Sequence, residues 1–158
     1  MAVYMAENAT VVGSVELGEN VNIWYGAVLR GDSGTIILGS GTNVQDNCVL
    51  HEKTLVGENC TIGHGAIVHG CTVGDNTTIG MGAIVLDGAV IGSNCIVGAG
   101  ALVTGKLNAP EGSLILGNPA KVVKPLTPEQ IAGNARNAAH YVALAKQSLP
   151  ERAGKAGK

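Results

Sequence analysis

A six-residue repeat of aliphatic side chains runs through most of this chain and restricts its fold more than any other feature. The repeat keeps its phase in three blocks, from Val11 to Leu29, from Leu38 to Val68 and from Val73 to Val103. Four residues after most of these anchors the side chain is Ala, Thr or Cys, and glycine often follows the anchor directly. A period of six with one aliphatic and one small residue is the signature of hexapeptide repeats.

The repeat predicts an all-β fold built as a parallel β-helix. Each hexad supplies one short strand and one turn, three hexads complete one coil of a triangular prism, and coils stack about 4.8 Å apart. The chain has no Phe and 24 Gly residues, because a narrow core excludes aromatic rings and tight corners need unusual backbone angles. The pattern leaves the handedness open, since the general crossover rule favours right-handed connections.

The C-terminal part of the chain has a different pattern, which predicts a helix. Thr127 suits the N-cap, Pro128 the first helical position, and Gln130 completes a capping box. Apolar residues then recur at spacings of three and four up to Leu149, which indicates one apolar helix face, and Pro150 ends it. The expected segments are a hexapeptide β-helix (8–104), an irregular exit (105–126), a C-terminal helix (127–149) and a disordered tail (150–158).

Composition excludes several function classes. The net charge is −2, so we expect no nucleic acid and no membrane as partner, and without a membrane-length apolar stretch or a leader pattern the expected location is cytoplasmic. The four cysteines should therefore be reduced thiols. Cys48, Cys60 and Cys95 occupy the small inward position, whereas Cys71 falls outside that register and is expected to face outward.

Two histidines are placed on one edge of the prism by the repeat. His51 and His69 each follow an anchor directly and lie 18 residues apart, which is three hexads and therefore one coil. Both imidazoles can reach one ion, with zinc–nitrogen bonds of about 2.0–2.1 Å. His64 belongs to a different face and cannot reach the same ion within one chain. Three-fold packing would bring it from a neighbouring subunit, which predicts a homotrimer with inter-subunit metal sites.

A single surface histidine is usually only a solvated polar residue, but here three of the four histidines lie within residues 51–69. Three imidazoles with one open position are typical of a catalytic zinc site rather than a structural one. Imidazole also suits Fe²⁺ and Co²⁺. We therefore expect Zn²⁺ as the cofactor, with iron and cobalt as alternatives.

An arginine is expected in the same column as these histidines. The step from Leu29 to Leu38 is nine residues, six plus three. If the three extra residues bulge within a single turn, Arg30 stacks one coil below His51, and His69 continues the column. The step from Val68 to Val73 is one residue short, which predicts a local distortion next to this edge.

Carboxylates and an amide lie near the column of Arg30, His51 and His69 and also near His64. Asp32 lies beside Arg30, while Gln45 and Asp46 share the column of His64. This placement suggests an ion pair between Arg30 and Asp46 across a subunit interface. The alternative is that these are ordinary turn residues.

The assembled motifs resemble the short-loop branch of the gamma-class carbonic anhydrase family, from about residue 8 to residue 145. They are Leu29–Asp32, Asn43–Asn47, the turn at His51, Ile62–Gly70 and the Gly117–Lys121 exit. The resemblance implies a left-handed β-helix homotrimer that binds zinc, or iron in some members, through His51, His64 and His69. It implies that metal-bound hydroxide attacks carbon dioxide to give bicarbonate, the reversible hydration of a lyase.

The resemblance also implies roles for the neighbouring residues. Arg30 and Asp46 would form an interface pair, Asp32 would support them, and Gln45 would lie next to the metal-bound water. Tyr141 in the helix resembles a Tyr near that site.

The chain departs from the best-studied branch of the family at the proton shuttle. That branch carries a Glu soon after the Arg-x-Asp motif and another in a long acidic loop, whereas here Ser33 follows Asp32 and the loop after His51 is only Glu52-Lys53-Thr54. Glu52 is the substitute shuttle that this loop offers, or else a solvated turn residue.

Three functions stay open on the sequence. The first is carbon dioxide hydration. The second is an acyltransferase or thioesterase acting on coenzyme A esters, because hexapeptide acyltransferases share the prism and the Gly117–Ala120 exit. The third is a non-catalytic metal-binding family member. The sequence gives neither the native metal nor the physiological substrate.

Overall fold

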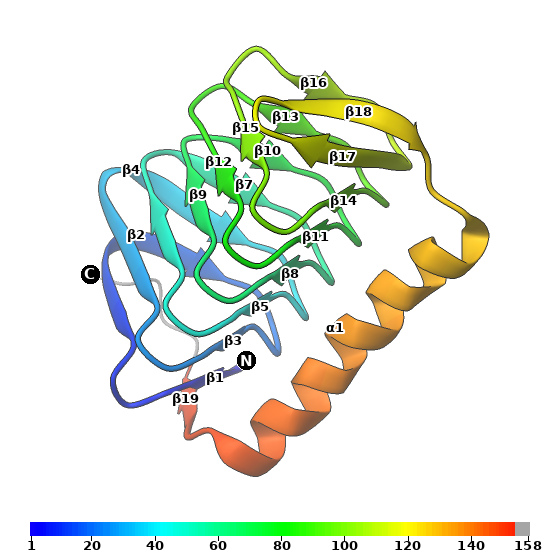
Figure 1. The fold of residues 1–158 in the computed structure, drawn as a ribbon. Helices are drawn as coiled ribbons and strands as arrows, with labels where there is room; N and C mark the ends of the chain where they lie inside the picture. Colours follow the sequence, from blue (N-terminus) through cyan, green and yellow to red (C-terminus); the bar gives the residue numbers. More distant parts are fainter. Residues whose placement is uncertain (154–158) are drawn as a thin grey trace.

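A computed structural model describes residues 1–153 and shows a parallel β-helix of left-handed hexapeptide type, flanked by one long helix (Figure 1). The strands of the helical coils are β1 (Ala2–Met5), β2 (Thr10–Leu17), β3 (Asn22–Ile23), β4 (Val28–Leu38), β5 (Asn43–Val44), β6 (Val49–His51), β7 (Thr54–Val56), β8 (Thr61–Ile62), β9 (Ile67–His69), β10 (Thr72–Val73), β11 (Thr78–Ile79), β12 (Ile84–Val85), β13 (Val90–Ile91), β14 (Ile96–Val97), β15 (Leu102–Val103), β16 (Asn108–Ala109) and β17 (Ser113–Gly117). The remaining elements are β18 (Ala120–Pro125), α1 (Pro128–Ser148) and β19 (Glu151–Ala153).

Strand register confirms the six-residue repeat. Every third anchor pairs with the next in a parallel ladder, so the prism has three internal columns of aliphatic residues. The columns are Ile23–Val44–Ile62–Ile79–Val97–Ile115, Leu29–Leu50–Val68–Val85–Val103 and Leu38–Val56–Val73–Ile91–Ala109. All of these side chains are buried. The anchors therefore form one continuous apolar core, whose removal from water is the main stabilising contribution.

The β-helix extends beyond the expected boundaries of residues 8 and 104. At its start, β1 pairs in parallel with β3. At its end, β16 and β17 pair in register with β13 and β14, so the expected irregular exit at 105–126 is wrong. The period continues through Ala109 and Ile115, and Ala109 hides it because a small residue occupies an anchor position. The antiparallel hairpin of β17 and β18 then covers the last coil.

The expected disordered tail is wrong for residues 151–153. These residues form β19, which pairs antiparallel with β1, and the Met5 amide donates to the Pro150 carbonyl at 3.0 Å. The outer edge of β1 exposes backbone groups that a further strand can satisfy. The rest of that expected tail, 154–158, lies outside the described residues.

Cys71 is buried, contrary to the expectation that it faces outward. Its exposed fraction is 3%, and Cys48, Cys60 and Cys95 are fully buried as predicted. Cys71 lies two residues before the anchor Val73. This is the same inward position that Cys48 and Cys95 occupy before their own anchors. The one-residue deletion lies in the turn before Cys71, so counting forward from the preceding anchor misplaces this residue.

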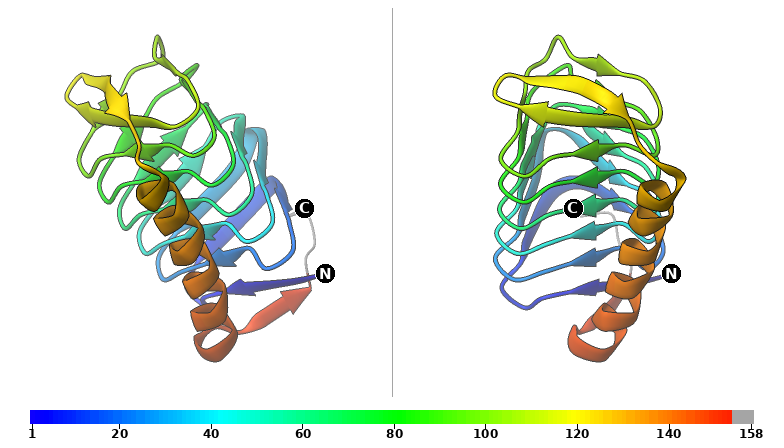
Figure 2. Two further views of the ribbon diagram at one scale, coloured as in Figure 1. Left: turned by 90° about the vertical axis from the view of Figure 1, so that its right-hand side faces the viewer. Right: turned by 45° about the vertical axis from the view of Figure 1, so that its right-hand side comes forward.

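Helix α1 runs along the prism beside β1, β3, β5 and β8 (Figures 1 and 2). It begins at the predicted capping box, in which Thr127 and Gln130 bond each other's backbone amides. Asn134 is buried against the prism, and its amide donates to the carbonyls of Asn76 and Cys95, each at 3.0 Å. These contacts fix the position of the helix along the coils. None of the helical residues described forms a segment long and apolar enough to cross a membrane.

Candidate metal centre

His51 and His69 lie one coil apart on the same edge of the prism. They are the last residues of β6 and β9, and the strand register pairs Arg30 with His51 and His51 with His69. The column predicted from residue spacing is therefore confirmed. Arg30 joins it because β4 continues unbroken through the three extra residues and pairs with both β6 and β7.

The two imidazole rings present one nitrogen each to the same point. The His51 Nδ1 lies 3.2 Å from the His69 Nε2. The outer nitrogens face carboxylates, with the His51 Nε2 2.9 Å from Asp32 and the His69 Nδ1 bonded to Asp87. An ionised carboxylate only accepts hydrogen bonds, so in neutral rings the outer nitrogens carry the protons. The inner nitrogens, the His51 Nδ1 and the His69 Nε2, then face each other with lone pairs. A cation bound between them would accept both lone pairs.

The geometry of this pair fits a divalent metal ion. Two ligands at about 2.05 Å on a tetrahedral zinc ion lie roughly 3.3 Å apart, close to the observed 3.2 Å between the two nitrogens. Carboxylates that fix the outer nitrogen of a ligating histidine are the usual second layer of such sites. The donor set therefore matches zinc, and also iron or cobalt.

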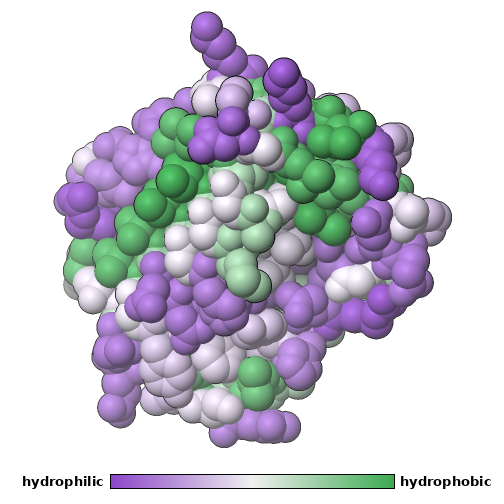
Figure 3. Space-filling model, in the orientation of Figure 1, coloured by the Kyte–Doolittle hydropathy of each residue, from purple (hydrophilic) through white to green (hydrophobic). Residues whose placement is uncertain are grey.

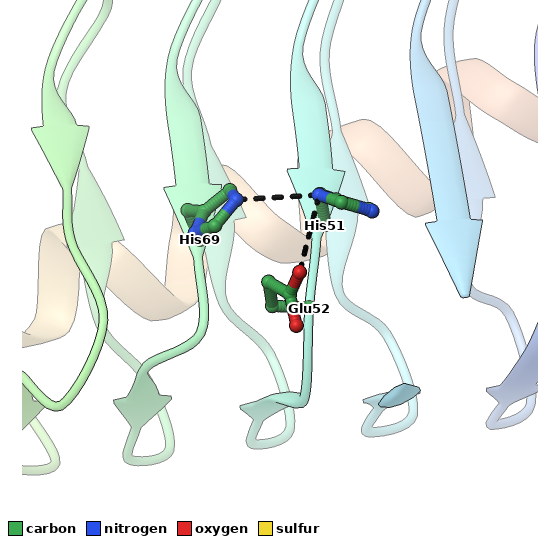
Figure 4. A group of neighbouring side chains, drawn as sticks. All are labelled: His51, Glu52 and His69. Atoms are coloured by element: carbon green, nitrogen blue, oxygen red, sulfur yellow. Dashed lines mark hydrogen bonds and ion pairs between the residues drawn. The ribbon is translucent and has the colours of Figure 1, made fainter. Parts of the chain in front are cut away.

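Glu52 extends this pair to a group of three ligand atoms. Its Oε1 lies 3.8 Å from the His51 Nδ1, and one atom each of His51, Glu52 and His69 lie within 4.8 Å of one another. Figure 4 shows the carboxylate oxygen directed toward the same inner nitrogen of His51. Among the described residues, this is the group of three side chains that could hold a metal ion within one chain.

Arg30 and Asp32 form an ion pair at the lower end of this edge. The Arg30 Nη1 lies 2.8 Å from the Asp32 carboxylate. The hydrogen bond from His51, followed by that from Arg30, lowers the pKa of Asp32 to about 2. Asp32 is therefore ionised at neutral pH and accepts a hydrogen bond from the His51 Nε2, as the neutral-ring arrangement requires.

His64 lies outside this group, as predicted. Its Nδ1 is 2.8 Å from the Asp46 carboxylate, and its backbone amide donates to the Gln45 side chain at 3.2 Å. Gln45 is buried and held in turn by Asn43, to which it donates at 3.1 Å. The carboxylate and the amide thus fix the His64 turn, but the ring, whose side chain is 48% exposed, meets no second histidine among residues 1–153.

Tyr141 joins the His64 group through a groove between α1 and the coils. The groove has a volume of about 260 Å³, and its lining includes Gln45, His64, Asn137 and Tyr141. Burial, and then the charge of Asp46, raise the pKa of Tyr141, so its hydroxyl is protonated at neutral pH. The predicted site residues therefore fall into two separate groups in one chain.

Asp87 is the residue at this centre that sequence reasoning missed. It follows β12 and bonds His69, 18 residues earlier. That interval equals the interval from His51 to His69, and it was the available signal. A Cβ at Gly70 would lie 2.7 Å from the Asp87 carboxylate, so the glycine after His69 gives this carboxylate its space.

Comparison with known proteins shows several relatives that match most of this chain. The chain is 47% identical to the "Probable carbonic anhydrase" of Methanocaldococcus jannaschii, over 91% of this chain and 93% of that protein. It is 44% identical to "Gamma carbonic anhydrase 2, mitochondrial" of Arabidopsis thaliana, over 91% of this chain. The chain spans about half, 55%, of the length of that plant relative.

The fold has close relatives among solved structures. The crystal structure of a hexapeptide transferase family protein from Anaplasma phagocytophilum superimposes with a TM-score of 0.91 at 43% identity, and covers 93% of this chain and 89% of that one. The family described as "GMPPB C-terminal domain" matches residues 32–131. The coils of this chain are thus shared with proteins of more than one activity, so its function has to be argued from the site.

Proposed function

Because this chain belongs to the gamma carbonic anhydrase family, we propose that it catalyses the reversible hydration of carbon dioxide to bicarbonate at a zinc ion. The observation that carries the proposal is the pair of inner imidazole nitrogens 3.2 Å apart, with both outer nitrogens held by carboxylates. A bound metal ion at this point supplies a nucleophile from water at neutral pH. Fe²⁺ is the alternative metal, since the same donors suit it.

The proposed active form is a homotrimer in which His64 of one chain completes the His51 and His69 pair of the next. A column of outward aliphatic side chains on the histidine-bearing sheet supports this arrangement. The column consists of Val28, Val49, Ile67, Ile84 and Leu102, one in each coil. Figure 3 shows it as an apolar band over β6, β9 and β12. The edge of the prism that carries Arg30, His51 and His69 is called the metal edge below. An apolar column beside the metal edge is suited to packing against another subunit.

The flanking polar residues have proposed roles at this shared site. Arg30, which pairs with Asp32 within one chain, would also pair with Asp46 of the neighbouring chain and so bind the edge of one subunit to the His64 turn of the next. Gln45 and Tyr141 would accompany His64 and present an amide and a hydroxyl to the substrate. Asp32 accepts a hydrogen bond from the outer nitrogen of the His51 ring and so orients that ring.

Proton transfer to solvent is assigned to Glu52. Its side chain is 33% exposed and lies 3.8 Å from His51, so its carboxylate contacts both the centre and water. A carboxylate in this position can accept a proton and exchange it with buffer.

The proposed reaction is tested by stopped-flow carbon dioxide hydration with protein reconstituted separately with zinc and with iron, beside His64→Ala. We expect turnover with at least one metal and its loss in the variant. Bound metal without turnover in either form would refute the hydratase proposal.

A second candidate is hydrolysis or transfer of coenzyme A esters. The similarity to a hexapeptide transferase family protein at a TM-score of 0.91 favours it. Thioester cleavage assays on the same two metal forms test for hydrolysis at the metal. A metal-free transferase would instead keep its activity in the presence of a chelator.

A further inference from the structure

Glu52 has a backbone conformation that is unusual for its residue type. The described non-glycine residues with positive φ are Asn20, Asn47, Asn59, Asn76, Asn94 and Glu52. Asn tolerates the left-handed region because its short side chain bonds locally, whereas a longer L-residue is strained there. Glu52 has a φ of 62° at the turn directly after a candidate metal ligand. Strain of this kind often accompanies a functional role.

The turn that carries Glu52 is held firmly by its neighbours. The His51 carbonyl accepts from the Thr54 hydroxyl at 2.9 Å and from the Gly70 amide at 3.0 Å. The Gly70 amide also donates to the Thr54 hydroxyl oxygen at 3.1 Å, and Thr54 is buried. This network fixes the backbone next to Glu52, whose Oε1 lies 3.8 Å from the His51 Nδ1.

The surroundings of Glu52 provide no ordinary reason for that placement. Among residues 1–153, its carboxylate lies near the His51 ring, with the Glu52 Oε1 3.8 Å from the His51 Nδ1. A neutral His51 donates its outer proton to Asp32, so its inner nitrogen has no proton to offer Glu52. Three electron-pair donors therefore converge, from His51, His69 and Glu52, and a metal ion would bind all three.

We propose that Glu52 is the third metal ligand supplied by the chain that carries His51 and His69, so that one chain can hold the ion without His64. Two histidines with one carboxylate form a recognised set for zinc and for non-haem iron. The inference rests on the proposed metal site, and it adds that His64 of a neighbour and Glu52 compete for one position. When His64 occupies it, the Glu52 carboxylate stays beside the centre, free for proton transfer.

The test is a double-mutant cycle on zinc affinity, measured by chelator competition on the full chain. Glu52→Gln alone should change affinity by less than about threefold, because His64 fills the position. His64→Ala should weaken zinc binding about 10-fold, and the double variant should weaken it by a further factor of about 10 or more, since removing both donors leaves two ligands. Equal affinities of His64→Ala and the double variant would overturn the proposal.

A matched control uses Glu58, another glutamate at a corner of the prism, which is absent from the ligand group. Glu58→Gln combined with His64→Ala should bind zinc like His64→Ala alone. The visible spectrum of bound Co²⁺ gives a second readout, which should differ between His64→Ala and the Glu52→Gln double variant.

Glu52→Asn separates ligation from a purely structural role of the turn. Asn is suited to the left-handed conformation, so this variant should raise the Tm and still weaken zinc binding in the His64→Ala background. A raised Tm with unchanged zinc affinity in that background would show that Glu52 is only a turn residue.

The outcomes keep this inference apart from the proposed reaction. Zinc binding that follows the predicted cycle, without carbon dioxide turnover, would support the ligand and refute the hydratase. Turnover in the wild type, with all zinc binding already lost in His64→Ala, would support the hydratase and overturn the Glu52 ligand.

Discussion

The metal edge and the His64 turn use the same local chemistry to different ends. In both regions an aspartate fixes one nitrogen of an imidazole, Asp32 for His51 and Asp46 for His64. On the edge, a second ring one coil away brings another nitrogen to within 3.2 Å, whereas no second histidine in the described part of the chain does this for the His64 ring. The difference shows that the repeat separates the histidines into two groups within one chain, which is the separation that the proposed shared site requires.

The largest effect should come from removing a histidine of the edge. His69→Ala leaves His51 as the only imidazole of the edge and breaks the preformed pair, so that binding would depend on the neighbour's His64 and on Glu52. We expect loss of stoichiometric zinc and of all measurable hydration. His64→Ala should keep part of its zinc. Metal content by atomic absorption, measured beside turnover, compares the two. Similar zinc loss in both variants would mean that the two regions contribute equally to affinity.

The second prediction separates the two regions physically. Ile67→Lys places a charge in the outward aliphatic column next to His69, so a trimer that packs through this column should dissociate. Sedimentation should show monomers, and hydration should fall by more than about 100-fold, because an open catalytic site loses one of its three ligands.

The control for this substitution lies on another face. Val90 is 40% exposed and belongs to the β13 ladder, not to the column of Ile67. Val90→Lys should leave both mass and turnover unchanged. A monomeric wild-type protein that is fully active would refute the shared site.

The third prediction concerns Asp87, the carboxylate that orients His69 on the metal edge. Asp87→Asn weakens the acceptor that orients His69, and loss of such second-layer contacts typically lowers metal affinity by about 10- to 100-fold. Asp75→Asn is the matched control, because Asp75 accepts the backbone amide of Glu58 at 2.8 Å and belongs to neither histidine group. Chelator competition measures both, and equal affinities in the two variants would assign no role to Asp87.

Sequence reasoning placed the two regions correctly because the repeat converts residue number into position. An interval of 18 residues put His51 and His69 on one edge, and the ladders confirm it. The same counting separated His64 from them. These predictions needed only the period and the direction of each side chain, both of which the core fixes.

The parts that sequence reasoning missed are those where the count changes or the residue type is unusual. The missing residue before Cys71 shifted the register by one and turned a core thiol outward in the prediction. Ala109 concealed a coil, because a small anchor gives no periodic signal. Asp87 was overlooked although its interval of 18 residues from His69 gave a signal. The strand at 151–153 depends on a tertiary contact with the open edge of β1, which no short-range pattern encodes.

The smallest effect on zinc binding and turnover is expected from a thiol reagent, because the cysteines next to the His64 turn and the metal edge are buried in the core. Burial raises the pKa of Cys48, behind the His64 turn, to about 11 and that of Cys71, behind the edge, to about 12. A thiol is nucleophilic only as thiolate, so both should stay unmodified by a disulfide reagent at pH 7.5 in the folded protein, with zinc binding and turnover unchanged. All four thiols should react in denaturant. Rapid labelling of Cys71 alone in the native state would mean that the edge opens locally at the deletion, and would distinguish it in stability from the His64 side.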